Sequence, residues 1–328
     1  MRLPFSILLL ALCPWTTGWA ATVSPKRSIG LTVGEIEDST KIGPVGPGAA
    51  GPRVVRAQIL LDRATYSPGQ IDGQYGDDLG IAIKGYQEAH SLPPSGTIDA
   101  EMWGLLNADA HPLLIDYTIT ALDVKGPFEA IPKDIQEQAR MKWLGYESPE
   151  EGLGEKFHLS PKLLAELNPG VEMKSAGVAI TVPNVRRGPG GHAVRVVVSK
   201  SRRTVTAYGA GDRILAQYPA TVGGEHDPLP IGHWTITSVS RYPWYFYNPD
   251  HFWYANPAAA TAKVPPGPRN PVGSVWMGLS KEHYGIHGTP DPGHIRHGES
   301  AGCVRLTNWD ANALALMVRR GTPAILEE

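Results

Sequence analysis

Cysteine is scarce in this chain, because its 328 residues include only two. Cys13 lies in an N-terminal segment with the features of a removable export signal, which leaves Cys303 as the only thiol of the mature protein. A single cysteine excludes an internal disulfide, so a disulfide would need a thiol from a second molecule. An exported protein with one unpaired thiol beside glycine, and with histidines upstream, is more typical of a cysteine nucleophile.

An excess of charge of either sign is also missing, since the formal net charge is -2. The chain therefore has no basic field for nucleic acid and no acidic tail that would indicate disorder. Beyond the N-terminal segment, no apolar stretch is long enough to cross a bilayer. We expect no nucleic acid among the partners and no transmembrane segment in the mature chain.

Residues 1–21 have the pattern of a signal peptide. Arg2 supplies a positive charge at the start, residues 5–12 form an apolar run too short for a mature membrane helix, and Gly18 and Ala20 offer small side chains for cleavage. The mature protein is then expected in the periplasm or cell wall. An uncleaved anchor is the alternative.

The length and the turn-rich composition indicate several domains. The chain contains 37 glycines and 30 prolines, which fits a largely β protein with linkers. Residues 22–52 are expected to form a linker, because residues 43–52 are a run of glycine, proline and small residues that sustains neither helix nor sheet. A second run of this kind, at residues 186–191, predicts a hinge.

Residues 53–108 carry apolar side chains at helical spacing in three segments, which predicts a small three-helix domain. The segment resembles the peptidoglycan-binding domain family, and this implies attachment to the cell-wall polymer. A generic helical spacer is the alternative. The resemblance is carried by Gln58-Ile59-Leu60-Leu61, Ile71-Asp72-Gly73-Gln74-Tyr75-Gly76, Tyr86-Gln87, Ser95-Gly96-Thr97-Ile98-Asp99 and Trp103.

Residues 112–185 form a second candidate module of α+β type. A short strand is expected at residues 117–120, a helix from Ser160-Pro161 to Leu167, and a closing strand at residues 179–183. Leu164, the run from Leu167 to Gly170 and the Val182-Pro183 end resemble a lysin motif, a glycan-binding fold. The segment between the first strand and the helix is long for that family. The module would bind glycan or merely brace the next domain.

Residues 193–327 change to a period of two, which predicts a mainly β domain with one C-terminal helix. Residues 194–199 and 204–208 indicate a hairpin, and residues 214–222 and 233–240 continue the sheet. Asn308 is expected to cap a helix over residues 309–319, with Arg319 in its last turn. Residues 322–326 would return as a final strand.

The chemistry of this domain centres on Cys303. A free thiol is mostly protonated at neutral pH, so acylation needs a nearby base or positive charge. His287 is the leading base, and one imidazolium contact of roughly 2 kcal/mol would lower the thiol pKa by about 1.5 units. Gly302 allows a tight turn that points amides at an oxyanion. Arg305 lies on the same side as Cys303 if this segment is extended.

Four motifs in this region, taken in order, resemble the L,D-transpeptidase catalytic domain of peptidoglycan enzymes. They are Pro230-Ile231-Gly232-His233-Trp234-Thr235-Ile236, Gly267-Pro268-Arg269-Asn270-Pro271-Val272-Gly273, Tyr284-Gly285-Ile286-His287-Gly288-Thr289 and Ser300-Ala301-Gly302-Cys303-Val304-Arg305-Leu306-Thr307-Asn308. The resemblance implies a β-sandwich-like fold. It also implies that Cys303 is the nucleophile and that His287 accepts and returns the proton.

The same resemblance implies roles for the neighbours of this pair. A carbonyl near Gly288 would orient the imidazole, amides around Gly302 and Cys303 would bind the oxyanion, and Ser300 would hydrogen-bond within the loop. Arg305 and Tyr284 would contact the substrate, although a purely structural Arg305 remains an alternative. Ala301 departs from the family, which often has a long side chain there, so this position supplies no essential proton.

The implied reaction has two steps and needs neither metal nor organic cofactor. The thiolate attacks the carbonyl between diaminopimelate and the terminal D-alanine of a stem tetrapeptide, and a thioester forms. An amine then takes the acyl group. A second stem peptide would give a crosslink, a lysine of an outer-membrane lipoprotein would give a tether, and water would give a carboxypeptidase. The expected partner is therefore peptidoglycan, both its stem peptides and its glycan strands.

Other interpretations of these residues stay open. Cys303 would be an inert buried side chain in a non-catalytic wall-binding protein, or the nucleophile of a hydrolase. The histidines at 283, 287, 294 and 297 could bind zinc together with Cys303, although their spacing matches no compact finger. The aromatic residues between 242 and 254 would form either a core patch or the wall of a cleft over the thiol.

Overall fold

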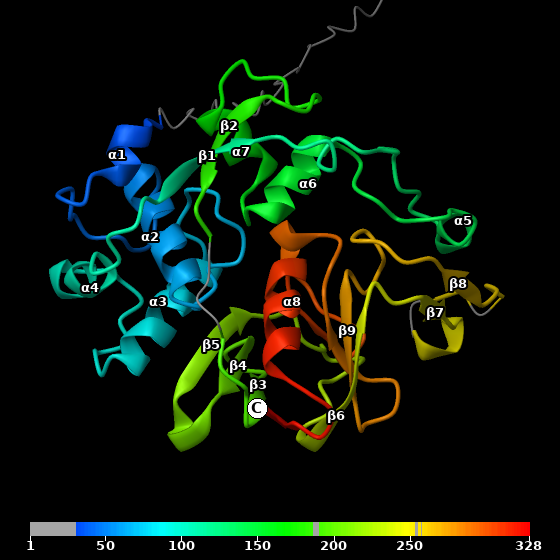
Figure 1. Cartoon of the computed structure of the whole chain (residues 1–328). Coiled ribbons are helices and arrows are strands. Elements are labelled where there is room, and N and C mark those ends of the chain that lie inside the picture. The colour runs from blue at the N-terminus through cyan, green and yellow to red at the C-terminus, as the bar shows by residue number, and fades with distance from the viewer. Residues whose placement is uncertain (1–30, 186–189, 253–254, 257) are drawn as a thin grey trace, which may run out of the picture.

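The structure, a computed structural model, describes residues 31–185, 190–252, 255–256 and 258–328 (Figure 1). The expected signal peptide at residues 1–21 lies outside the described residues, as does most of the expected hinge. None of the helices within these ranges is long and apolar enough to cross a membrane.

Three helices form where the sequence predicts them. They are α2 (Pro52–Arg63), α3 (Asp77–Ala89) and α4 (Ala100–Leu106). Pro52 occupies the first turn of α2, and the side chain of Asp99 caps α4 by accepting from the backbone N–H of Met102. The three predicted helices are confirmed.

The expectation of a flexible tether before this domain is wrong for its described part. Residues 33–37 form α1 (Val33–Glu37), and both Ile36 and Val45 are buried. Val45 pairs with Ile98, and the indole N–H of Trp103 donates to the carbonyl of Gly43 at 2.9 Å. Glycine and proline prevent regular structure here, but they do not prevent an irregular segment from packing against its neighbours.

The next segment contains two paired strands and three short helices. Strand β1 (Leu114–Thr118) pairs antiparallel with β2 (Ala179–Pro183), and β1 begins three residues earlier than expected. Between them lie α5 (Ile135–Gln138), α6 (Pro149–Lys156) and α7 (Pro161–Leu167). Ser148 caps α6 and Ser160 caps α7, each by accepting from a backbone N–H three residues on.

These two segments share one hydrophobic core, which runs from Ile36 in α1 to Val182 in β2. The sequence predicted two separate modules. The shared core has a physical reason, because a segment of 50 to 70 residues buries only a modest fraction of its apolar surface by itself. The N-terminal half is therefore a single packed unit.

The C-terminal half is built on an eight-stranded mixed sheet with the strand order β11-β10-β9-β6-β12-β3-β4-β5. The expected sandwich-like arrangement is instead one curled sheet. Strand β6 (Gly232–Arg241) pairs through its first half with β12 and through its second half with β9. The other strands are β3 (Arg195–Ser199), β4 (Thr204–Tyr208), β5 (Ile214–Pro219), β9 (Val275–Leu279), β10 (Gly285–His287), β11 (Val304–Arg305) and β12 (Pro323–Glu327).

One helix, α8 (Asn308–Met317), packs against this sheet, and its ends differ from the prediction. Thr307, not Asn308, is the N-cap and accepts from the backbone N–H of Asp310. The helix ends at Met317, so Arg319 lies beyond its last turn. Asn308 is instead fully buried, with its side chain turned into the protein.

The N-terminal unit is docked on the edge of the sheet. Residues beside Tyr66 run parallel to edge strand β5, with the N–H of Ser67 donating to the carbonyl of Gln217 and the N–H of Gln217 donating to Thr65, each at 2.9 Å. The hydroxyl of Ser67 donates to Asp310 of α8 at 2.7 Å. These contacts cover the β5 edge of the sheet, whose backbone groups would otherwise be unpaired.

Candidate active site

The residues expected to react lie on two neighbouring strands. Strands β10 and β11 are parallel, with Ile286 opposite Val304 and His287 opposite Arg305. Ile286 and Val304 both belong to the hydrophobic core. Because side chains alternate along a strand, His287 and Arg305 point to the other face. Cys303 directly precedes β11, two residues before Arg305, and so lies beside Gly285 at the same end of this strand pair.

The imidazole of His287 is buried and held in one orientation. It stacks on Trp276, its cross-strand neighbour on β9, with ring centroids 5.4 Å apart. Its Nδ1 lies 2.7 Å from the carbonyl oxygen of Gly288. The backbone carbonyl expected near Gly288 is therefore present at the ring.

This environment determines which nitrogen of His287 is available. Burial, together with the positive charge of Arg305, lowers the pKa of His287 to about 3, so the ring is neutral at pH 7. A carbonyl can only accept, so Nδ1 carries the proton and donates it to Gly288. Nε2 is therefore the nitrogen that is unprotonated and able to accept a proton.

The thiol of Cys303 is not the preformed thiolate that the sequence predicted. Burial raises the pKa of Cys303, and the opposing effects of the Gly285 N–H and Arg305 are smaller. The Sγ donates to the carbonyl oxygen of His283 at 3.7 Å. At pH 7 the site thus holds a neutral thiol and a neutral imidazole.

The loop before Cys303 is fixed by its own backbone and by a neighbouring segment. The hydroxyl of Ser300 donates to the carbonyl of Cys303, and the Ser300 N–H donates to Val222 at 3.1 Å. Arg305 and Thr221 exchange two backbone hydrogen bonds of 2.8 and 3.0 Å. Residues 221–222 therefore fix both sides of the cysteine loop.

Gly302 adopts a left-handed conformation, with φ of +82°. A β-carbon at this position would lie 2.6 Å from a ring carbon of Tyr284. The backbone N–H groups of Gly302 and Cys303 have no hydrogen-bond acceptor within the described part of the chain. They are available for the oxyanion role that we assign to them below.

A substitution of Gly302 tests this geometry. We expect Gly302→Ala to lower the free energy of unfolding by about 1–3 kcal/mol, because alanine is strained at positive φ and its β-carbon displaces Tyr284. Transfer activity should fall more than tenfold as the loop shifts. Urea unfolding and product formation measure the two effects.

The same loop provides a matched control in Gly298, which has φ of +85° and open space around its β position. Gly298→Ala should lower the free energy of unfolding through backbone strain alone, because its β-carbon contacts no other atom. It should keep most of the activity. Equal losses in the two variants would contradict the assigned contact with Tyr284.

Arg305 lies within electrostatic reach of both reacting groups, since it affects the pKa of His287 and of Cys303. Its guanidinium makes no ion pair or hydrogen bond with any residue that the structure describes. A β-carbon on Gly302 would lie against the ring of Tyr284, and burial raises the pKa of Tyr284, with a further contribution from Cys303. Arg305 and Tyr284 therefore both interact electrostatically with the thiol, and their contact with substrate stays a prediction.

The aromatic segment after β6 is an exposed arm and not a core patch. Its strand β7 (Tyr245–Tyr247) pairs with β8 (Ala262–Val264), and Trp244 and Phe246 are 47% and 69% exposed. The ring of His251, at the end of this arm, lies 4.6 Å from the ring of His283, whose carbonyl accepts from the thiol. One end of the arm therefore contacts the turn before β10, whose His283 carbonyl accepts from the thiol.

The histidines considered for zinc do not converge in the structure. His294 pairs with Asp291, His283 lies next to His251, and His287 is enclosed by Trp276. Among the described residues, no three histidine, cysteine or acidic side chains are arranged to hold a metal ion.

Two site residues were missed in the sequence. Trp276 encloses His287, and Asn308 lies behind Gly288, where a side chain on Gly288 would overlap its carboxamide oxygen. Trp276 carries no local signal, because its role depends on the pairing of β9 with β10. Asn308 was noticed, but as a helix cap.

Comparisons with known proteins match two segments of the chain. Residues 193–326 match the family model of the L,D-transpeptidase catalytic domain, and residues 50–106 match the model described as "Putative peptidoglycan binding domain".

Individual known proteins are also similar to this chain. "Putative L,D-transpeptidase YkuD" of Bacillus licheniformis is 33% identical over 174 residues, covering 52% of this chain and 89% of that protein. Its namesake in Bacillus subtilis is 30% identical over 169 residues, covering 51% and 85%. A crystal structure of the L,D-transpeptidase from Xylanimonas cellulosilytica aligns over 86% of this chain and 96% of that chain, at 14% identity and a TM-score of 0.38.

Proposed function

The chain belongs to the L,D-transpeptidase family, and from this premise we propose that Cys303 and His287 carry out a two-step acyl transfer on stem tetrapeptides. The protein is a peptidoglycan transpeptidase, and its partner is peptidoglycan. The observation that best supports the cysteine mechanism is the placement of Cys303 beside the strand pair that carries His287, with Nδ1 of the imidazole committed to Gly288.

In the first step, Nε2 of His287 removes the thiol proton as sulfur attacks the carbonyl of the diaminopimelate–D-alanine bond. Negative charge develops on the carbonyl oxygen, where the N–H groups of Gly302 and Cys303 would donate to it. The intermediate collapses, the C–N bond breaks, and the imidazolium returns the proton to the leaving amine of D-alanine. A thioester on Cys303 remains.

In the second step, an acceptor amine attacks the thioester and His287 takes its proton. Collapse restores the thiol and leaves a new amide. A side-chain amine of a second stem peptide gives a crosslink, a lipoprotein lysine gives a tether, and water gives hydrolysis. Arg305, with its uncommitted guanidinium, would bind a carboxylate of the stem peptide.

The N-terminal unit would hold the enzyme on its polymer. Residues 53–108 are the proposed anchor, and residues 112–185, which we propose to be a lysin-motif-like module, would bind glycan or brace the catalytic domain. Weak binding by such modules raises the local concentration of stem peptide. Export through residues 1–21 would deliver the chain to the periplasm or cell wall.

Product analysis tests this function. We expect purified protein incubated with disaccharide-tetrapeptides to release D-alanine and to form dimers detectable by mass spectrometry. Tripeptides without dimers would indicate a cysteine carboxypeptidase instead. The absence of both products would refute the assigned reaction and favour a non-catalytic wall-binding protein.

A further inference from the structure

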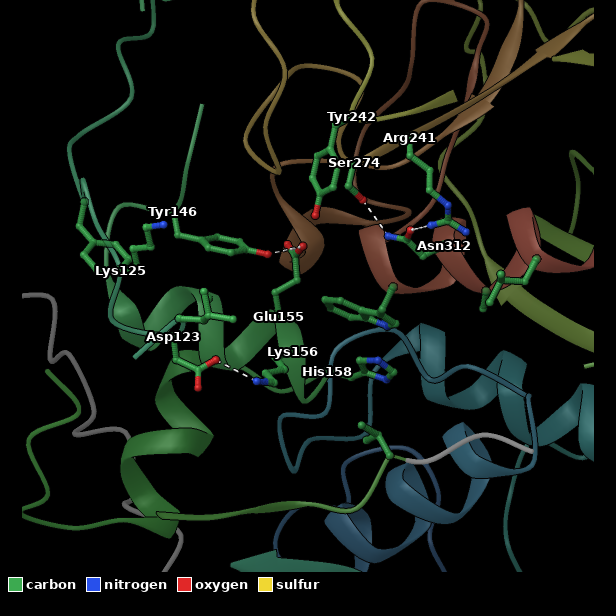
Figure 2. Close-up of a pocket in the computed structure, with 17 residues that line it drawn as sticks. Asp123, Lys125, Tyr146, Glu155, Lys156, His158, Arg241, Tyr242, Ser274 and Asn312 are labelled. Carbon is green, nitrogen blue, oxygen red and sulfur yellow. Dashed lines mark hydrogen bonds and ion pairs between the residues drawn. The ribbon is translucent and has the colours of Figure 1, made fainter. Parts of the chain in front are cut away.

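A cavity of about 590 Å³ lies where residues 112–185 meet the catalytic domain (Figure 2). Its lining includes Tyr146 and Glu155 from one side, and Tyr242, Ser274 and Asn312 from the other. Helix α6, which carries Glu155, contacts α8 at this junction. Neither Cys303 nor His287 lines the cavity, so this junction is separate from the reacting groups.

Glu155 is the point at which the two parts are joined by hydrogen bonds. The side-chain amide of Asn308 donates to both carboxylate oxygens of Glu155 at 3.1 Å. The hydroxyl of Tyr146 donates to one of them at 2.9 Å, and Figure 2 shows the tyrosine pointing at the carboxylate. The carboxylate thus accepts from two donor groups, the Tyr146 hydroxyl of its own module and the Asn308 amide at the start of α8.

Asn308 links Glu155 to the backbone segments that lie next to His287. Its carboxamide oxygen accepts from the N–H of Ser274 at 2.8 Å, and its amide also donates to the carbonyl of Pro268 at 3.1 Å. The same oxygen packs so closely on Gly273 and Gly288 that a side chain at either glycine would overlap it. Gly288 in turn supplies the carbonyl that orients His287.

We propose that Glu155 is a positioning residue for the reaction: through Asn308 it fixes Gly288, and through Gly288 it fixes the imidazole of His287. Residues 112–185 would then complete the catalytic unit in addition to any binding of the polymer. This proposal depends on the proposed function, because it concerns the base of that reaction. Buried polar networks that are fully satisfied specify one arrangement of the groups they join.

The ionised carboxylate is the form that suits this network. Two donor groups face it, and the proton of a neutral carboxyl would compete with the Asn308 amide for one of the two oxygens. Burial raises the pKa of Glu155 to about 7, while the donors Asn308 and Tyr146 lower it. The other charged or titratable groups that face it are Glu151, which raises its pKa, Arg269, which lowers it, and Tyr242.

A pH dependence follows from this arrangement. His287 has a pKa of about 3, and burial raises the pKa of Cys303. Neither group therefore makes kcat fall as the pH is lowered through 7, a fall that we call the acid limb of the pH profile. Glu155 loses its proton as the pH rises through about 7. The wild-type kcat should therefore rise with pH in this range as the network becomes complete.

Three variants of the full chain test the proposal. Glu155→Ala should lower kcat about 10- to 100-fold with KM changed less than about twofold, because the base is misplaced while the substrate contacts remain. Glu155→Gln keeps one acceptor for Tyr146 and Asn308, so its kcat should lie between those of the wild type and Glu155→Ala. Its pH profile should lack the acid limb near pH 7. Glu150→Gln, on the same helix but without a hydrogen bond or ion pair within the described chain, should match the wild type.

A spectroscopic measurement separates positioning from general destabilisation. We expect the Nδ1–H proton resonance of His287 to be sharp in wild type and Glu150→Gln, weaker in Glu155→Gln, and exchange-broadened in Glu155→Ala at equal folded fraction. A folded Glu155→Ala with wild-type kcat, or a Glu155→Gln that retains the acid limb, would overturn the proposal. If Glu155→Ala does not fold, the pH profile of Glu155→Gln decides. An active Cys303→Ala would instead refute the proposed function itself.

Discussion

Cys303→Ala is expected to abolish both dimer and tripeptide formation, with a loss of at least about 1,000-fold. No other residue that the structure describes has a sulfhydryl, and an acyl-enzyme cannot form without a nucleophile. The measurement is the rate of D-alanine release from disaccharide-tetrapeptide, followed together with the mass of the protein. The wild type should gain the acyl group during turnover, and the variant should not.

The control for this variant is its fold. Alanine fills less space than cysteine, and Cys303 lies in a loop rather than in the hydrophobic core, so urea unfolding should change by less than about 1.5 kcal/mol. A carbapenem provides a second readout: by family resemblance we expect a covalent mass shift on Cys303 that the variant lacks. Substantial product formation by folded Cys303→Ala would exclude the thioester route.

Alkylation of the resting thiol is expected to be slow at neutral pH. The sequence analysis expected an imidazolium contact to lower the pKa of Cys303, and a thiol with a lowered pKa would react faster with iodoacetamide at pH 7. Because burial raises the pKa of Cys303, alkylation of the free enzyme should instead accelerate at alkaline pH. Slow labelling at pH 7 is therefore compatible with a nucleophile that is deprotonated only as substrate is attacked.

The sequence predicted those parts of the fold that depend on local patterns. The helical spacing of residues 53–108 and the hairpin of β3 and β4 were both recognised, because periodicity and turn residues are properties of a short window. The motif around Cys303 was informative for the same reason. Gly302 could be identified as a turn residue before its φ of +82° was known.

Features that depend on distant pairing could not be predicted in this way. Trp276 meets His287 only because β9 and β10 pair, and Glu155 reaches Asn308 across 153 positions of sequence. The pKa of Cys303 was predicted in the wrong direction for a related reason. Its sign depends on how deeply the folded chain buries the thiol, which the motif does not reveal.

Asn308 shows how a local rule is overridden. Asparagine is a favourable N-cap, and Asn308 stands at the start of α8, so the capping assignment was reasonable. Thr307 takes that role, because its hydroxyl accepts from the N–H of Asp310 at 3.2 Å. This frees the Asn308 amide to join Glu155 to the backbone behind His287.

The second large effect is expected at His287. His287→Ala should lower the rate of acyl transfer about 10²- to 10⁴-fold, since it removes the group that takes the thiol proton. His287→Asn is the matched variant, because its side-chain amide can still donate to the carbonyl of Gly288 but offers no basic nitrogen. Both variants should be impaired in D-alanine release, and near-normal activity of either would refute the assigned base.

Acid stability tests the same histidine without measuring activity. The folded pKa of about 3 lies below the usual value of 6.5, so between these values the unfolded chain binds a proton that the folded chain does not. His287 therefore destabilises the fold as the pH falls below 6.5, by up to about 1.4 kcal/mol per pH unit. Urea unfolding between pH 4 and pH 7 should show a smaller pH dependence in His287→Asn than in wild type. If the pH dependence is the same in both proteins, the imidazole has the same pKa in the folded and unfolded chains. An imidazole with that behaviour would not be buried between Trp276 and Gly288, which would contradict the assigned position of Nε2.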